Sequence, residues 1–183
     1  MQNPTWAATN TLRLKNKQKP ADTMKEKHID ITLMQYTVEE LDADMRHLVD
    51  MAKEATGRSY SPYSHFSVGA AVLLADGTVV IGANQENAAY PSGLCAERTA
   101  LFAAGAQYPD MPVVALAIAA RNERGLFTPQ PVSPCGACRQ VMLEVEERYH
   151  QPMQVLLYGT EVVNVLKSAR DLLPLCFLDA DMH

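Results

Sequence analysis

The spacing of apolar positions near residue 45 predicts an amphipathic helix. Apolar residues recur every three or four positions there, at Leu41, Met45, Leu48, Val49 and Ala52. This period places them on one face of a helix that can pack against a core. Thr37-Val38-Glu39-Glu40 has the form of a capping box, so we expect the helix to begin here and to end at Gly57.

Short apolar runs predict strands between further helices. Residues 66–74 and 79–81 are apolar and partly β-branched, and Asp76-Gly77 between them favours a hairpin turn. Three further strands are expected, at Val113–Ala119, at Met153–Tyr158 and, more weakly, at the alternating Ile29, Ile31 and Leu33. Helices are expected after Cys95, after Cys135 and over residues 167–173. Strands interleaved with helices predict an α/β sandwich with a mixed sheet.

The N-terminal stretch differs from the rest of the chain. Residues 1–23 are polar and aperiodic and contain Pro4 and Pro20, which is typical of a disordered tail. Met24 stands just before the patterned sequence and is an alternative translation start. With no internal repeat or linker beyond it, we expect residues 24–183 to form one domain.

Composition and charge narrow the functional classes. Hydrophobic residues make up 48% of the chain and charged residues 20%, as in ordinary globular proteins. We find neither a membrane-length apolar run nor a secretory signal, which predicts a cytoplasmic protein without membrane association. Residues 37–183 carry ten Lys or Arg against eighteen Asp or Glu. Because nucleic-acid binding needs clustered cations, this acidic body favours a small uncharged substrate.

The cysteines form the strongest local chemical signal. Cys95-Ala96-Glu97 is followed by Pro134-Cys135-Gly136-Ala137-Cys138, and each segment lies at or beside an expected helix start. Helix N-termini lower thiol pKa values and so favour the thiolates that Zn²⁺ requires. Three thiolate ligands leave the fourth tetrahedral position open to water, which is typical of a catalytic zinc site. Glu97 is close to a ligand without being one, so we expect it to transfer protons.

Two other interpretations of the cysteines compete with this one. A C-x-x-C pair alone is also typical of redox proteins, although the upstream Cys-Ala-Glu disfavours that interpretation. A closed Cys₄ zinc site would need Cys176 as its fourth ligand. Cys176 lies in an apolar stretch with no partner at ligand spacing, so we expect it to be a small buried hydrophobe.

Five runs of residues share their order and composition with a known family. They are Ser61–Ala71 (SPYSHFSVGAA), Asn84–Tyr90 (NQENAAY), Cys95–Ala100 (CAERTA), Ser133–Gln140 (SPCGACRQ) and Leu172–Pro174 (LLP). These runs resemble the small homotetrameric cytidine deaminases, over roughly residues 37–178. The resemblance implies a sheet of about five strands between helices, a three-layer α/β/α sandwich. It also implies a homotetramer with one Zn²⁺ per subunit.

The resemblance implies a reaction and a role for each matching residue. Water attacks C4 of cytidine or deoxycytidine, releasing ammonia and leaving the uridine product, in pyrimidine salvage. Cys95, Cys135 and Cys138 would bind zinc, and Glu97 would move the protons. Asn84 and Glu86 would bind the sugar 3′-hydroxyl, while Phe66 and Ala96 would also contact the substrate. Arg98 would partner the thiolates, and Phe177 would cover the pocket of a neighbouring subunit.

Other functions remain open on the sequence. A deaminase of another aminated heterocycle, such as blasticidin S, shares the zinc motifs, whereas the Asn84–Asn87 run favours a ribosyl substrate. Deaminases of nucleotides or polynucleotides typically have His in place of Cys95 and need cations for phosphate. An alternative from a different functional class is a zinc-binding module without turnover. Glu97 discriminates against that interpretation, because a purely structural site has no use for this carboxylate.

Overall fold

The computed structural model describes residues 25–183. Residues 31–183 form one compact unit, and residues 25–30 have no regular secondary structure. The expected tail, residues 1–23, and the alternative start at Met24 lie outside the described residues. Among the described residues, no helix is long and apolar enough to cross a membrane.

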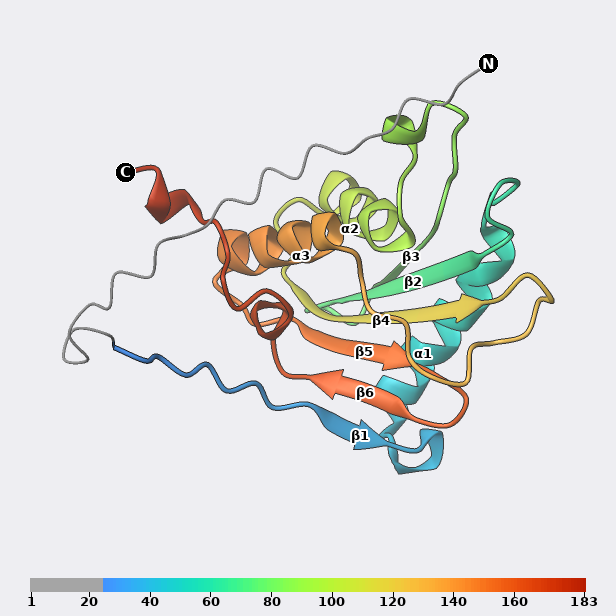
Figure 1. The fold of residues 1–183 in the computed structure, drawn as a ribbon, viewed down its shortest axis with the longest axis horizontal. Coiled ribbons are helices and arrows are strands. Elements are labelled where there is room, and N and C mark those ends of the chain that lie inside the picture. Colours follow the sequence, from blue (N-terminus) through green and yellow to red (C-terminus); the bar gives the residue numbers. More distant parts are fainter. Residues whose placement is uncertain (1–24) are drawn as a thin grey trace, which may run out of the picture. The chain divides into compact units, whose positions relative to one another are not determined.

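The core of residues 31–183 is a mixed sheet of six strands (Figure 1). The strands are β1 (Met34–Tyr36), β2 (Ser67–Leu74), β3 (Val79–Ala83), β4 (Val113–Arg121), β5 (Gln154–Tyr158) and β6 (Val163–Leu166). Their order is β1-β6-β5-β4-β2-β3, and β4 and β5 are the one parallel pair among them. The predicted hairpin of β2 and β3 is confirmed, with Gly77 at φ 89° in its turn.

Three long helices cover the two faces of this sheet (Figure 1). Helix α1 (Ala43–Ala55) packs on one face, where its Leu48 and Val49 join a buried cluster with β4, β5 and β6. Helices α2 (Ala96–Gln107) and α3 (Gly136–Tyr149) pack on the other, around Leu116, Ile118 and Met142. The expected three-layer α/β/α sandwich is therefore confirmed, with six strands rather than about five.

Two glycines let helices approach the sheet at backbone distance. A Cβ atom at Gly82 of β3 would lie 2.4 Å from the Ala100 nitrogen of α2. A Cβ atom at Gly69 of β2 would lie 2.2 Å from the Ala52 carbonyl oxygen of α1. Because real Cβ contacts are much longer, no other residue fits at either position without moving a helix. Gly82 thus fixes the distance between α2 and the sheet.

Some element boundaries differ from the sequence prediction. The Thr37 box begins only a 3₁₀ turn (Val38–Glu40), where the Glu40 carboxylate accepts from the Thr37 amide at 2.8 Å. Helix α1 begins after it, because Asp42 accepts from the Met45 amide and acts as the N-cap. The expected strand at residues 29–33 is wrong, since pairing with β6 begins at Met34. Helix α1 ends at Ala55, before Gly57.

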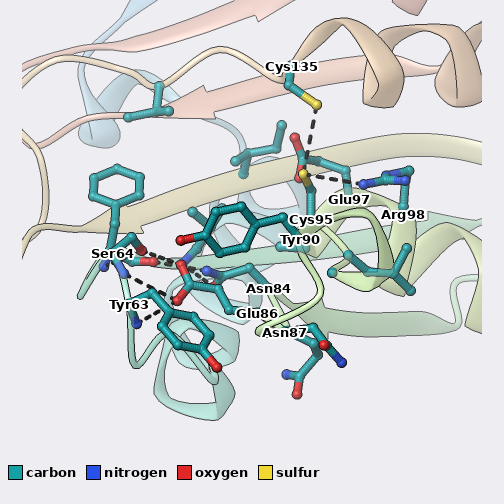
Figure 2. Close-up of a pocket in the computed structure, with 18 of the residues that line it drawn as sticks. Tyr63, Ser64, Asn84, Glu86, Asn87, Tyr90, Cys95, Glu97, Arg98 and Cys135 are labelled. Carbon is teal, nitrogen blue, oxygen red and sulfur yellow. Dashed lines mark hydrogen bonds between the residues drawn. The ribbon is translucent and has the colours of Figure 1, made fainter.

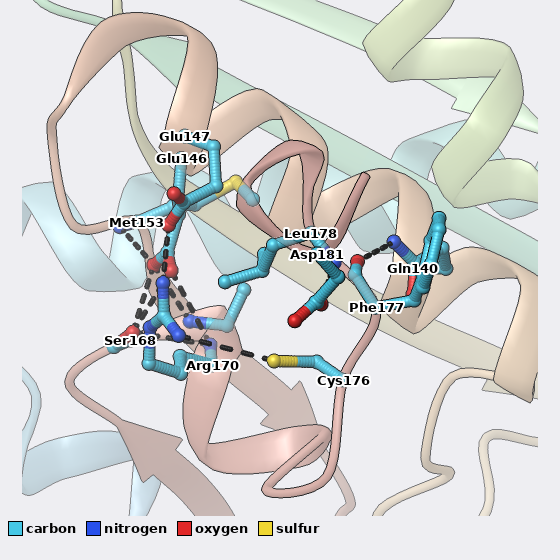
Figure 3. Close-up of polar contacts among 11 residues, drawn as sticks. Gln140, Glu146, Glu147, Met153, Ser168, Arg170, Cys176, Phe177, Leu178 and Asp181 are labelled. Atoms are coloured by element: carbon cyan, nitrogen blue, oxygen red, sulfur yellow. Dashed lines mark hydrogen bonds and ion pairs between the residues drawn. The ribbon is translucent and has the colours of Figure 1, made fainter. Parts of the chain in front are cut away.

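The segment after β6 is held along α3 by a buried carboxylate (Figure 3). Glu146 is 6% exposed and accepts from the amides of Met153 and Ala169 at 2.6 and 2.8 Å. It also accepts from the Ser168 hydroxyl and the Arg170 amide, at the start of a 3₁₀ helix (Ala169–Leu172). This helix confirms the one expected over residues 167–173.

The chain then leaves the core, and Cys176 is not buried as expected. Its sulfur is only partly covered and lies 3.9 Å from Nη1 of Arg170 (Figure 3). Leu175 and Phe177 on either side of it are 83% and 58% exposed, so residues 175–177 do not pack into the core formed by the described residues. The prediction was wrong because the residues next to Cys176 in the sequence are apolar, whereas its contact in space is the charged side chain of Arg170.

Candidate metal centre and active site

The three cysteines of the motif meet at the N-termini of α2 and α3. Cys95 is the N-cap of α2 and Cys135 is the N-cap of α3, and Cys138 follows within the first turn of α3. Both helices lie on the same face of the sheet, so their first turns present the sulfurs to one point. The positive end of each helix stabilises negative charge there.

The spacing of these sulfurs suits a zinc ion. The Sγ atoms of Cys95, Cys135 and Cys138 all lie within 4.8 Å of one another. The Cys95–Cys135 distance is 3.8 Å and the Cys135–Cys138 distance is 3.4 Å (Figure 2 shows the first). Thiolates about 2.3 Å from a tetrahedral zinc lie about 3.8 Å apart. Among the described residues no His joins this group, and Cys176 is not part of it.

The thiols differ in their tendency to ionise. A hydrogen bond with Cys138, and then the contact with Arg98, lowers the pKa of Cys95 to about 5. The same hydrogen bond with Cys95, together with burial, raises the pKa of Cys138. Of these two thiols, Cys95 is therefore the one that ionises more readily. Binding of zinc by all three sulfurs would release the remaining protons.

Arg98 lies beside the sulfurs, where the sequence places it. Its Nη2 is 3.8 Å from Sγ of Cys95 (Figure 2). The hydrogen bond to Cys95 raises the pKa of Arg98 further, so the guanidinium stays charged. Three thiolates and Zn²⁺ sum to a charge of −1, which a neighbouring guanidinium offsets.

Glu97 is a buried carboxyl group next to the metal position. It is 4% exposed and lies in the first turn of α2, with its side chain at the wall of the main cavity. Burial, and then the negative charge of Cys95, raises the pKa of Glu97. A carboxyl group whose pKa is shifted towards neutrality can both accept and donate a proton near pH 7.

A cavity of about 670 Å³ opens beside these residues (Figure 2). This volume lies within the usual range for small-molecule sites. The cavity is lined by Cys95, Cys135, Glu97, Arg98, Phe66, Asn84, Glu86 and Ala96 from the predicted set. It therefore brings the metal position, the carboxyl group and the expected substrate residues together. Phe177 is absent from this lining.

The polar side chains of the cavity are already engaged with the protein. Asn84 accepts from the Val68 amide at 2.8 Å and donates to the Phe66 carbonyl oxygen at 2.9 Å. Glu86 accepts from the amides of Tyr63 and Ser64 at 2.9 and 3.2 Å (Figure 2). The hydrogen bond from the Ser64 hydroxyl is the largest cause that lowers the pKa of Glu86, so this carboxylate is ionised.

Several residues that line the cavity carry no role predicted from the sequence. The rings of Tyr63 and Tyr90 lie edge to face with centroids 6.3 Å apart, and both rings are largely exposed (Figure 2). Ser64 contacts Glu86 directly. All three belong to the runs Ser61–Ala71 and Asn84–Tyr90, so the signal was present. Their contacts with one another could not be predicted, because these two runs are separated in the sequence and meet only in the folded chain.

Phe177 lies apart from the cavity of its own chain. The residue is 58% exposed, and its carbonyl oxygen accepts from Nε2 of Gln140 at 2.8 Å (Figure 3). Gln140 is two residues beyond Cys138 on α3, so the backbone at Phe177 is tied to the helix that begins at the metal position.

Comparison with known proteins agrees with this arrangement. Residues 43–150 match the model of the cytidine and deoxycytidylate deaminase zinc-binding region. Cytidine deaminase of Halalkalibacterium halodurans is 50% identical over 102 residues, which cover 56% of this chain and 72% of that protein. A probable cytidine deaminase of Dictyostelium discoideum is 30% identical over 140 residues, covering 76% and 87%.

Solved structures share the fold. The chain is similar to the crystal structure of cytidine deaminase from Burkholderia pseudomallei, with a TM-score of 0.62 and 43% identity. That likeness covers 72% of this chain and 97% of the other. Cytidine deaminase from Mycobacterium tuberculosis gives a TM-score of 0.59 and 34% identity, covering 75% and 99%. Since the matched zinc-binding region spans more than half of the chain and contains all three clustered cysteines, the chain belongs to the family of zinc-binding cytidine and deoxycytidylate deaminases.

Proposed function

We propose that this protein hydrolytically deaminates cytidine and deoxycytidine to uridine and deoxyuridine, releasing ammonia. The observation that carries the proposal is a buried carboxyl group, Glu97, beside a three-thiolate zinc site at the wall of a cavity of about 670 Å³. A structural zinc site does not need this carboxyl group or an adjoining cavity, which disfavours a binding module without turnover.

In the proposed mechanism, Cys95, Cys135 and Cys138 hold zinc and Glu97 moves the protons. When bound, zinc supplies a Lewis acid that makes water a nucleophile at neutral pH. Glu97 accepts a proton from the attacking water and delivers it to the ring nitrogen as the new C4–O bond forms. It then accepts the second proton from the C4 hydroxyl and delivers it to the amine, which leaves as ammonia while the C4 carbonyl forms. Burial suits it to this work, because it raises the pKa of Glu97. Arg98 offsets the negative charge of the thiolates.

The remaining lining residues are proposed to bind the nucleoside. Phe66 packs against the base and Ala96, at the start of α2, forms part of the wall beside it. Asn84 and Glu86 hydrogen-bond the 3′-hydroxyl of the sugar. Polar groups committed to a substrate hydroxyl reject analogues that lack it, because the groups are then left unpaired. This disfavours the alternative, a deaminase of a heterocycle without ribose.

We further propose that the protein works as a homotetramer in the cytoplasm, in pyrimidine salvage, with residues 24–183 as the deaminase domain. An exposed ring at Phe177, tied to α3 through Gln140, suits a residue that covers the site of a neighbouring subunit. None of the four cysteines, all within the described residues, forms a disulfide, which is consistent with a reducing compartment.

The proposal is tested by following absorbance near 280 nm with purified, zinc-loaded protein. Cytidine, deoxycytidine and blasticidin S are offered separately at equal concentrations. We expect both nucleosides to be consumed with release of ammonia, and blasticidin S to remain. Consumption of blasticidin S alone would move the assignment to the alternative substrate class. A zinc-loaded protein that consumes none of the three would refute deaminase function on these substrates.

A further inference from the structure

Asn84 has almost no hydrogen-bonding capacity left for a ligand. Its Oδ1 accepts from the Ser59 hydroxyl at 2.5 Å and from the Val68 amide at 2.8 Å. Its Nδ2 donates one hydrogen to the Phe66 carbonyl oxygen at 2.9 Å. A side-chain amide has two acceptor positions and two donor hydrogens, so one N–H of Asn84 has no partner among residues 25–183.

Glu86 has almost no capacity left to accept hydrogen bonds, as Asn84 has almost none left to donate them. Its Oε2 accepts from the amides of Tyr63 and Ser64, and its Oε1 accepts from the Ser64 hydroxyl (Figure 2). A carboxylate has about four lone-pair positions, so about one remains, on Oε1. Together Asn84 and Glu86 offer one donor and one acceptor. A hydroxyl group is the partner that uses both at a single atom.

Ser64 controls the oxygen that keeps this acceptor position. Its amide holds Oε2 and its hydroxyl holds Oε1, so one residue contacts both carboxylate oxygens. Without the hydroxyl, the carboxylate is anchored at Oε2 alone and can pivot, because the terminal torsion of Glu is broad. The same hydroxyl oxygen accepts from the Phe66 amide at 3.1 Å. Ser64 therefore also links the carboxylate to the residue proposed to face the base.

We propose that Ser64 is a positioning residue for sugar recognition. Its hydroxyl fixes Oε1 of Glu86, so that the remaining lone pair accepts from a substrate hydroxyl that in turn accepts from Asn84. The inference rests on the proposed nucleoside function and deepens it. It assigns the selectivity for a sugar hydroxyl to the exact fit of one donor and one acceptor, set by a residue that itself need not touch the substrate.

The test removes the Ser64 hydroxyl and the ligand 3′-hydroxyl, separately and together. Calorimetry gives the dissociation constants of uridine and 3′-deoxyuridine for the zinc-loaded full chain, the parent and Ser64→Ala. Ser64→Thr, which keeps the hydroxyl, is measured beside them. Ser92→Ala is the matched control, since Ser92 is also an exposed serine, in the short 3₁₀ helix Tyr90–Ser92, but does not line the cavity. Values of kcat and KM for cytidine and 3′-deoxycytidine complete the set.

For Ser64→Ala we expect uridine to bind about tenfold more weakly, the size of one hydrogen bond to a charged group. Binding of 3′-deoxyuridine should change less than about twofold, since that ligand makes no use of Oε1. KM for cytidine should rise with little change in kcat, and Ser64→Thr should restore most of the loss.

Two results would overturn the inference. Equal weakening of uridine and 3′-deoxyuridine would show that Ser64 supports the loop as a whole and not the sugar contact. Unchanged binding of uridine would show that the hydroxyl positions nothing. Failure of the parent to consume any nucleoside is a different result, since it refutes the proposed function and removes this inference with it.

Discussion

Replacing Glu146 by Ala should destabilise the protein more than any surface change on the same helix. Its carboxylate is the acceptor for the buried amides of Met153 and Ala169, and it also accepts from the Ser168 hydroxyl (Figure 3). In the variant at least two buried N–H groups lose their acceptor. Each loss costs about 1–3 kcal/mol, and removing a buried charge recovers part of its desolvation cost. We therefore expect a net loss of about 3–4 kcal/mol.

The loss is measurable as a shift of the thermal midpoint. For a chain of 150–250 residues, 1 kcal/mol corresponds to about 2–4 °C, so the expected drop is about 10 °C. Parent and variant are compared by calorimetry at equal protein and zinc concentrations, because binding equilibria also shift the midpoint. Glu146→Gln keeps one oxygen but turns an NH₂ group towards a donor. Its thermal midpoint should therefore fall between those of the parent and Glu146→Ala.

Glu144→Ala is the matched control on α3, because Glu144 is exposed and lies two residues earlier. Its midpoint should stay within about 2 °C of the parent, as for most surface substitutions. A similarly small shift for Glu146→Ala would refute the reasoning. It would mean that water or a rearranged 3₁₀ turn satisfies the amides as well as the carboxylate does.

Three further outcomes are expected. Glu97→Gln should keep zinc yet lose at least about 100-fold in turnover, whereas Cys135→Ala should lose both zinc and stability. Measuring zinc by elemental analysis beside the activity assay separates the two effects. A fully active Glu97→Gln protein would refute the proton-transfer role of Glu97. When Phe177→Ala and Glu97→Gln proteins are unfolded and refolded together, the activity of the mixture should exceed the average of the two separate variants, because some sites then combine an intact Phe177 with an intact Glu97. The mixture should elute as a tetramer, whereas a monomer of about 20 kDa would exclude a shared site. A chain beginning at Met24 should keep its activity and its melting temperature, and a large drop in either would show that residues 1–23 are not a dispensable tail.

The metal position could be predicted from the sequence because its geometry is local. Cys135 and Cys138 lie one helical turn apart, and Cys95 lies at the start of α2, the other long helix on the same face of the sheet. Helix N-termini and ligand spacing follow from short stretches of residues.

Other features could not be predicted because their causes are non-local. Strand β6 has four residues, and only its pairing with β5 and β1 makes it a strand. The hydrogen bonds that leave Asn84 one N–H without a partner in the described part of the chain come from Ser59, Val68 and Phe66, which approach it from separate parts of the fold. The hydrophobic neighbours of Cys176 in the sequence predict burial, yet the described part of the chain leaves Cys176 only partly covered and Leu175 83% exposed.

The close approach of Gly82 to α2 limits how this enzyme can diversify. Where two side chains touch, exchanging one for a larger or smaller residue adjusts the spacing of the elements that carry them. Where backbone meets backbone no such exchange exists, because a Cβ at residue 82 would lie 2.4 Å from the Ala100 nitrogen. Substitutions at residue 82 of β3 therefore cannot shift α2 in small steps, and with it the positions of Cys95 and Glu97 relative to the cavity. New substrate preferences would have to arise in the loops at 61–66 and 84–94, where several side chains line the cavity and can vary without moving the helix.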